Sequence, residues 1–425
     1  MRLKRTAVTA AMCLWCASPW AQQPGTLTLE EAITRVIARH PDLARSRYSR
    51  EGARAEVDEA AQRPEFRAGI ESENWPGTGS KSGPGEAQVT LSLASVLELG
   101  GKRAARVEVA GARLDGLTLK EEARRLDLLA EVARRFLDLL AGQYLVEIAE
   151  ADLSQREKVV RAASQRVRAG ASPDSVRLMA EAAVSRAKLR RNRAQAQTRA
   201  VARSLAALWN DRSANFDRAA GDPLVPFAVP SLDALSALLE DNPQLRQFAD
   251  ERRLREARVQ LARSASTPDI EWQAGVRRLE STKEWTAVLG VSIPLGTRAR
   301  AQPRVKAAQA ELAALSLEHE SEEITLYETL IDAHARVMAA RDEADMVRTD
   351  LLPRLGQAEQ AAERAYRAGA LSYLEWAQLQ SDTTTARQEQ LEAAIEAYRA
   401  LIEIQRLTGQ SFNAAEFTTS TESSP

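Results

Sequence analysis

The residues most able to do chemistry in this 425-residue chain are few and isolated. His40, His319 and His334 stand singly in helical stretches, without the HExxH pattern or the paired spacing of a metal site. The glycine pair Gly100 and Gly101 lacks the GxGxxG context of a nucleotide-binding loop. We therefore expect no catalysis, no cofactor and no metal site from these residues.

The cysteines, Cys13 and Cys16, both fall in a leader-like N-terminus. Its basic start, its apolar stretch and the small residues that follow predict a signal peptide over 1–21, cleaved after Ala21. Bulky residues precede both cysteines, so a lipid anchor is not expected. The mature chain would then contain no thiol, which excludes disulfides and thiolate catalysis.

A stretch of ten residues that occurs twice favours interaction over catalysis. AASQRVRAGA at 162–171 and AAERAYRAGA at 361–370 match at six positions, each at the end of a long alanine-rich helical run. The glycine is explained by helix capping, and the serine that follows by the start of the next helix. A cap needs no arginine, so the repeated Arg168 and Arg367 predict donors for a partner.

Composition favours long helices over compact cores. Aromatic residues make up 5% of the chain and charged residues 28%, which is little material for the cores of two or three globular domains. The formal net charge of -1 gives no basic surface for nucleic acid. After the leader, no stretch of 18 apolar residues indicates a membrane-spanning helix.

Internal repetition divides the chain into two similar units. HPDL at 40–43 is answered by NPQL at 242–245, and LELGGKR at 97–103 by IPLGTR at 293–298. The paired RAGA loops follow in the same order. The predicted repeats are 22–230, which includes a linker over 210–230, and 231–409, followed by a C-terminal tail over 410–425.

Alternating apolar and polar residues predict one β-hairpin in each repeat. The expected strands lie at about 64–73, 86–98, 268–280 and 284–295. A sheet half-buried on a soluble core would show the same alternation. Trp75, Trp272 and Trp285 near the strand ends favour an outer-membrane barrel with interfacial aromatic residues.

On this interpretation the two faces of each strand differ in their surroundings. Leu91 and Leu289 are expected to face lipid, and Thr90 and Gly290 to face water. Four strands cannot close a barrel, and an open edge cannot sit in lipid with its backbone unpaired. The barrel must therefore be shared between subunits.

The helical segments are unusually long. Residues 103–169 contain no proline and would span about 100 Å as one helix. Reversals at the RAGA loops predict helical hairpins over about 103–209 and 300–409, with an interruption at Pro353. Small alanine side chains permit close, coiled-coil-like packing.

After the signal peptide, the same order of elements occurs twice: helix, β-hairpin, long helix, RAG turn and helix. This repeated order resembles the TolC family of outer-membrane efflux proteins. LTLEEAITRVIARHPDL near the N-terminus and LELGGKR are similar to its heavy-metal-efflux branch. The resemblance implies a mainly α fold with a small β part, and a homotrimer with a 12-stranded outer-membrane barrel on a periplasmic helical tunnel. It also implies an RND-type inner-membrane pump and a periplasmic adaptor as partners.

The family resemblance gives the two RAGA turns a position and a partner. It implies that they are the periplasmic tips that meet the adaptor. The expected docking residues are Arg168, Gly170, Arg367, Gly369 and Leu371.

Other residues are candidates for gating or for the passage from strand to helix. Asp174 and Glu375 are candidate gate residues, although Glu375 also fits a capping box with Ser372. The strand-to-helix junction is expected at Gly100, Gly101, Lys102 and Arg103. Its glycines supply backbone freedom, and its two cations could ring the tunnel below the membrane.

Two classes of function fit this sequence. One is a passive exit duct for metal cations or drugs. The alternative is a soluble periplasmic adaptor or coiled-coil scaffold, which would also show a signal peptide and helical hairpins. Two full repeats with amphipathic strands between their helices favour the duct.

Overall fold

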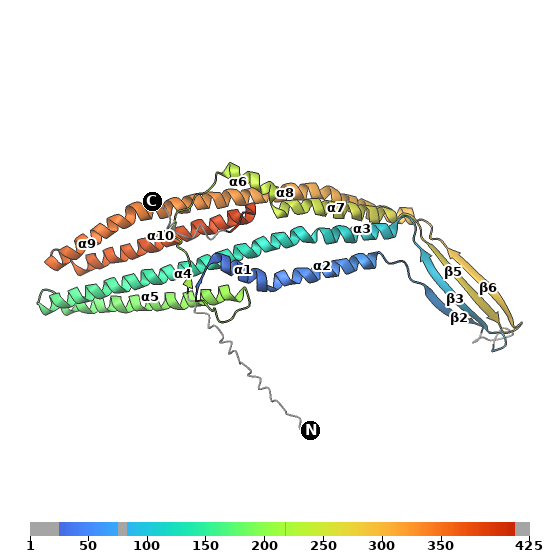
Figure 1. Cartoon of the computed structure of the whole chain (residues 1–425), viewed down its shortest axis with the longest axis horizontal. Coiled ribbons are helices and arrows are strands. Elements are labelled where there is room, and N and C mark those ends of the chain that lie inside the picture. Colours follow the sequence, from blue (N-terminus) through green and yellow to red (C-terminus); the bar gives the residue numbers. More distant parts are fainter. Residues whose placement is uncertain (1–24, 75–82, 217, 413–425) are drawn as a thin grey trace, which may run out of the picture.

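The computed structural model describes residues 25–74, 83–216 and 218–412 of the chain. The molecule is long and narrow, with a body of helices and a four-stranded sheet at one end (Figure 1). The predicted fold class, mainly α with a small β part, is confirmed. The expected signal peptide, Trp75 and the tail beyond residue 412 lie outside the described residues.

Each repeat supplies half of the helical body. The first contributes α1 (Leu29–Arg39), α2 (Pro41–Ala60), α3 (Lys102–Asp115), α4 (Leu117–Arg168) and α5 (Asp174–Ala207). The second contributes α6 (Leu232–Leu238), α7 (Pro243–Ser264), α8 (Thr297–Met346), α9 (Leu352–Ala368) and α10 (Tyr373–Thr408). No helix among the described residues is both long enough and apolar enough to cross a membrane.

The helices pack as two sets along the molecule. Towards the sheet, α3 packs against α2 and α7, and α7 packs against α8. Away from the sheet, α4 packs against α5 and α10, and α10 packs against α8 and α9. The helices α2 and α8 are therefore the two edges of the set beside the sheet (Figure 1).

Both long ascending helices are interrupted. The run expected to be unbroken from residue 103 breaks at Gly116, where α7 comes close: a Cβ on Gly116 would lie 3.6 Å from the Asp250 Cβ. In the second repeat a π-helical turn, Val347–Leu351, separates α8 from α9. Pro353 follows this turn and lacks the N–H that a regular helix needs, which explains the predicted interruption.

The repeated HPDL and NPQL motifs are helix starts. His40 Nδ1 accepts a hydrogen bond from the backbone N–H of Asp42 at 3.2 Å. Asn242 Oδ1 does the same for Gln244 at 2.7 Å. In both motifs the proline occupies the first turn, where its missing N–H costs nothing.

The four long strands form one antiparallel sheet in the order β2, β3, β5, β6. Their bounds are β2 (Arg67–Glu73), β3 (Gln88–Leu97), β5 (Ile270–Leu279) and β6 (Glu284–Ser292). The central pair, β3 and β5, joins the two repeats, with Leu91 opposite Val276. Within the part of the chain that the structure describes, the outer strands β2 and β6 each have one unpaired edge.

A second, very small sheet pairs β1 (Thr26–Leu27) with β4 (Arg218–Ala219) in parallel. Two-residue strands are too short to show an alternating pattern, so no periodicity predicts them. They bring the start of the described chain to the linker between the repeats.

One face of the large sheet is apolar and open. Ile70, Leu289 and Val291 are 77%, 83% and 70% exposed, and their register places them on the same face as Leu91. Exposed apolar patches of this kind mark a surface that another apolar phase or protein covers.

The opposite face is polar, and it corrects one expectation. Thr90 was expected to face water, but it is only 1% exposed. Arg277 lies over it: Arg277 Nε donates to Thr90 Oγ1 at 2.9 Å, and its Nη2 lies 3.4 Å from a Glu73 carboxylate oxygen. A cross-strand arginine, 187 positions away in the sequence, therefore shields Thr90.

The main core lies in the middle of the helical body. Buried side chains from both repeats form it, including Phe136, Trp209 and Leu330. The linker after α5 packs onto this core: Tyr398 donates its hydroxyl hydrogen to the Val225 carbonyl oxygen at 2.9 Å.

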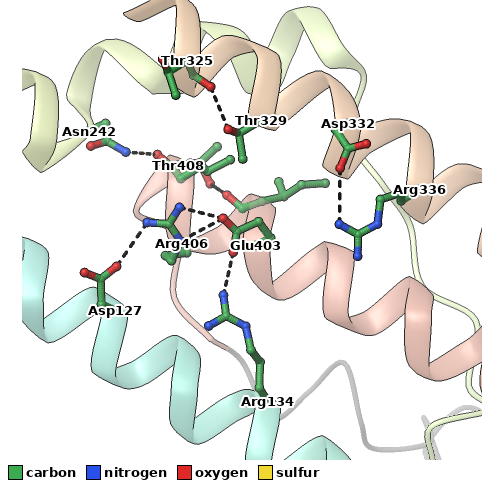
Figure 2. Close-up of polar contacts among 12 residues, drawn as sticks. Asp127, Arg134, Asn242, Thr325, Thr329, Asp332, Arg336, Glu403, Arg406 and Thr408 are labelled. Atoms are coloured by element: carbon green, nitrogen blue, oxygen red, sulfur yellow. Dashed lines mark hydrogen bonds and ion pairs between the residues drawn. The ribbon is translucent and has the colours of Figure 1, made fainter. Parts of the chain in front are cut away.

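A charged network ties α10 to both repeats beside this core (Figure 2). Glu403 lies between two cations, 2.6 Å from Arg134 of α4 and 2.7 Å from Arg406. Arg406 also reaches Asp127 at 3.2 Å. Burial opposes ionisation of Glu403, but bonding to Arg406 and Arg134 outweighs it and lowers the pKa of its carboxyl. Asn242 adds a hydrogen bond to the Leu407 carbonyl oxygen at 2.6 Å.

The lowered pKa of Glu403 predicts an acid-dependent contribution to stability. Its stabilising effect is fully present above the ordinary glutamate value of 4.5 and is lost as the pH falls through the lowered value. Glu403→Gln should cost about 1.5–3 kcal/mol at pH 7, measured by thermal loss of the helical circular dichroism signal. The difference from wild type should shrink at pH 3.

Glu396→Gln is the matched control. Glu396 pairs with Arg336 on an exposed surface, where such pairs are worth about 0–1 kcal/mol. Equal losses in both variants would contradict the special role of the Glu403 network.

Candidate functional site

The two RAGA turns adopt the same backbone conformation at the end of the body farthest from the sheet (Figure 1). Gly170 and Gly369 have φ values of +69° and +85°, which disfavour any other residue. In the first turn Gly170 N–H bonds to the Val167 carbonyl and Ala171 N–H to Arg166. The second turn repeats this pattern, so both helices end in a Schellman motif.

The two tips are packed together by their own small core. Its buried members come from α4, α5, α9 and α10, and they include Tyr366 and Trp376, whose ring centroids are 5.0 Å apart. Leu371, an expected docking residue, packs half-buried against this core. The exposed apolar side chain at the second turn is Leu374, which is 62% exposed.

The two recurring arginines lie on the exposed rim of the tips. Arg168 Nε donates a hydrogen bond to the Ser164 carbonyl oxygen of its own helix at 3.3 Å. Arg367 pairs with Glu363 at 2.6 Å while its side chain stays 69% exposed. In the described residues, the contacts of both guanidinium groups are with neighbours on their own helices, and both side chains are exposed.

Arg166, which the sequence argument passed over, joins the two tips. Its Nη1 donates to the Tyr366 carbonyl oxygen, and its guanidinium lies 4.9 Å from the Tyr366 ring centroid. Its Nε also reaches Ser172 Oγ at 3.2 Å within the first turn. The second copy of the loop has Ala365 at the matching position, and this difference was the only sequence signal.

The two candidate gate carboxylates each lie in the first turn of a helix. Asp174 forms a two-pronged pair with Arg177, at 2.7 and 3.0 Å, which lowers the pKa of its carboxyl. Glu375 completes a capping box with Ser372, and these hydrogen bonds lower its pKa as well. Both are therefore held ionised by local contacts.

The strand-to-helix junction is built by close approach of the two repeats. Gly100 and Gly101 both have φ of +71°, and a Cβ on Gly100 would lie 2.6 Å from the Thr267 side chain. Lys102, one of the two cations that could ring the tunnel, pairs through its Nζ with Asp269 at 2.6 Å, and its side chain is only 15% exposed. Arg103 is exposed.

The histidines are placed apart from one another. His40 caps α2, His334 Nε2 lies 3.2 Å from the Pro230 carbonyl oxygen, and His319 packs edge-on against Phe248. Within residues 25–74, 83–216 and 218–412, no three His, Cys, Asp or Glu side chains gather as a metal site.

Comparison with known proteins gives the class of molecule that has this repeated fold. The family model described as "Outer membrane efflux protein" matches residues 32–211 and 234–410. The chain belongs to this family. It is therefore an outer-membrane efflux protein, and the predicted resemblance to the TolC family is confirmed. The alternative of a soluble adaptor or scaffold is set aside.

Particular relatives refine this class. The chain is 26% identical over 388 residues to the cobalt-zinc-cadmium resistance protein CzcC of Cupriavidus metallidurans, covering 91% of each chain. Its fold matches a solved structure of CusC with a TM-score of 0.75, at 17% identity, covering 97% of this chain and 99% of that one. A membrane protein from Pseudomonas aeruginosa matches with a TM-score of 0.74, at 19% identity over 99% and 98% of the two chains.

The contacts of Arg166 predict that it holds the tips together. Arg166→Ala should raise amide hydrogen exchange over residues 366–372 about tenfold, because hydrogen bonds from a charged donor are lost. Mass spectrometry of peptides from this region would measure it. Arg168→Ala, two residues away and without a contact to the second tip, should leave the exchange rate unchanged. Equal rates in both variants would show that Arg166 does not join the tips.

Proposed function

We propose that this protein is the passive outer-membrane exit duct of a tripartite efflux system that exports metal cations. The observation that carries the proposal is the exposed apolar sheet face at one end of a long helical body, in a member of this family. The metal-cation cargo is inferred from the name of the CzcC relative. No catalytic step is required of such a duct.

The assembly we propose is a homotrimer, exported by the signal peptide at 1–21. The described part of each chain offers four strands, whose outer edges at β2 and β6 it leaves unpaired, and these edges need partners in lipid. Three chains would supply twelve strands for one barrel and a helical tunnel beneath it. The linker at 210–230 would lie in a collar around the middle of that tunnel.

The proposed orientation of the sheet is tested by placing a charge on each face. Leu289→Arg should cost about 2–4 kcal/mol, because the side chain would face the bilayer midplane. Gly290→Arg should be tolerated better, since its Cβ would point to the other face with its nearest neighbour, the Gln273 Cβ, at 3.8 Å. The measurement is the yield and thermal stability of folded protein in the outer-membrane fraction.

Gly290 serves as the control on the opposite face of the sheet. Thr90 is unsuitable as a control, because it is buried beneath Arg277. Equal tolerance of arginine at 289 and 290 would mean that the apolar face does not contact lipid.

We further propose that the tips dock a periplasmic adaptor, which links the duct to an RND-type inner-membrane pump. Arg168 and Arg367 would donate to carbonyls or carboxylates of the adaptor, and Gly170 and Gly369 would expose backbone to it. Leu371 would support the second turn from within. Asp174 and Glu375, at the first turns of the descending helices, are the proposed gate carboxylates.

Reversing both rim arginines tests the docking proposal. Arg168→Glu combined with Arg367→Glu should leave the protein folded, since exposed substitutions usually cost under about 0.5 kcal/mol. It should abolish cross-linking to the adaptor and raise cadmium and cobalt accumulation in cells that depend on this duct.

The matched control is Arg161→Glu combined with Arg364→Glu, which reverses two exposed arginines farther from the turns. If the tip variant still supports full metal efflux, the tips do not dock the adaptor through these arginines. If wild-type protein restores no metal tolerance to a strain that lacks the duct, the metal cargo is wrong.

A further inference from the structure

A charge pair locks the two repeats together where the sheet meets the helices. Asp269, just before β5, accepts a hydrogen bond from the backbone N–H of Leu99 at 3.1 Å. Its carboxylate also pairs with Lys102 Nζ at 2.6 Å, and the side chains are only 28% and 15% exposed. This contact fixes the end of β3 beside the start of β5.

The same residue types stand at the two outer junctions of the chain. PEF at 64–66, just before β2, repeats PDI at 268–270, which leads into β5, so that Glu65 corresponds to Asp269. The leucine-glycine pair after β3 recurs after β6, and a base follows each leucine by three positions, Lys102 in one case and Arg298 in the other.

These outer residues lack the partner that their counterparts have. The Glu65 side chain is 75% exposed, and among the described residues its ion pair is with the equally exposed Arg67, at 3.2 Å. Leu295 is 90% exposed. Arg298 is exposed and forms no ion pair with any residue in the described part of the chain.

The repeat also fixes how β6 would pair with β2 of another copy. Within the chain Leu93 lies opposite Ala274. When the repeats are aligned on these motifs, Leu93 of β3 corresponds to Leu289 of β6. In the same way, Ala274 of β5 corresponds to Ile70 of β2. Both of these are exposed members of the apolar face, so this register keeps the face continuous from one copy to the next.

The edge helix below β6 extends this surface. Leu317, Ile324 and Ile331 of α8 are spaced by seven residues and are 68%, 53% and 40% exposed. Such spacing is typical of a helix that packs against another helix. Since α8 and β6 share one side of the molecule, one occupant, a second copy, can cover both (Figure 1).

We propose that Arg298 of one copy and Glu65 of the next form the ion pair that locks the sheet between copies, with Leu289 opposite Ile70. The Leu295 N–H donates to the same Glu65 carboxylate, as Leu99 does to Asp269. The inference rests on the proposed trimer, and it names the residues and the register that close it.

The ion pair is tested by charge exchange. Arg298→Glu should make the trimer dissociate several-fold faster on heating in detergent, and Arg298→Glu with Glu65→Arg should restore most of the wild-type rate. Arg300→Glu is the matched control, because Arg300 is an exposed base on the same turn with no counterpart in the Lys102 contact, and it should not change the rate. A double reversal no better than the single one would overturn the ion pair.

The register is tested by disulfide formation. Leu289→Cys with Ile70→Cys should give oxidised chains linked between copies, because directly opposed strand residues lie within disulfide reach. Leu289→Cys with Ser72→Cys, two positions along the same face, should link poorly. Linking at 72 rather than 70, or at neither, overturns the register.

Chemical cross-linking of the wild-type protein distinguishes a failure of this inference from a failure of the proposed trimer. A wild-type trimer whose variants fail both tests refutes this inference and leaves the proposed function standing. A wild-type monomer or dimer in folded, detergent-solubilised protein refutes the proposed trimer itself.

Discussion

The structure depends on one constraint: the outer edges of β2 and β6 carry backbone N–H and C=O groups that no other strand among the described residues pairs. In lipid these groups cannot be left to water, so the sheet requires further strands. The internal repeat shows how such strands can pair, because β3, the last strand of the first repeat, pairs with β5, the first strand of the second. The helices below must keep α2 and α8 at the edges of the body for the same contact to form between chains.

The two repeats have similar backbone conformations but differ in their side chains. These differences mark contacts that only one of the described repeats makes. The Schellman turns at Gly170 and Gly369 are alike, while Arg166 faces its contact at Tyr366 and the second copy has Ala365. This one arginine joins the two tips of a chain. Duplication therefore supplied the architecture, and divergence at single positions supplied the links between the copies.

Local patterns predicted most of the fold, because strand alternation, the glycine turns and Pro353 act through neighbouring residues. The strand positions, the helix reversals and the interruption before Pro353 follow from such patterns. Burial of Thr90 and pairing of Lys102 did not follow, because Arg277 and Asp269 reach them from the other repeat. The role of Arg166 was missed for the same physical reason: its acceptor is a backbone carbonyl, which no sequence motif identifies.

The contacts that hold the helical body together differ between its middle and its tips. The middle has a large core and the network of Glu403, Arg134 and Arg406 between repeats. The tips have a small core that buries the Tyr366 hydroxyl and the Trp376 indole N–H without a hydrogen-bond partner in the described residues. Each unsatisfied group costs about 1–3 kcal/mol, and the same cost applies to the buried Arg50 Nε, Glu121 Oε1 and Gln244 Oε1 atoms of α2, α4 and α7. The main core gathers more buried apolar side chains from both repeats than the tip core does, so burial of apolar surface stabilises the middle of the body more than the tips.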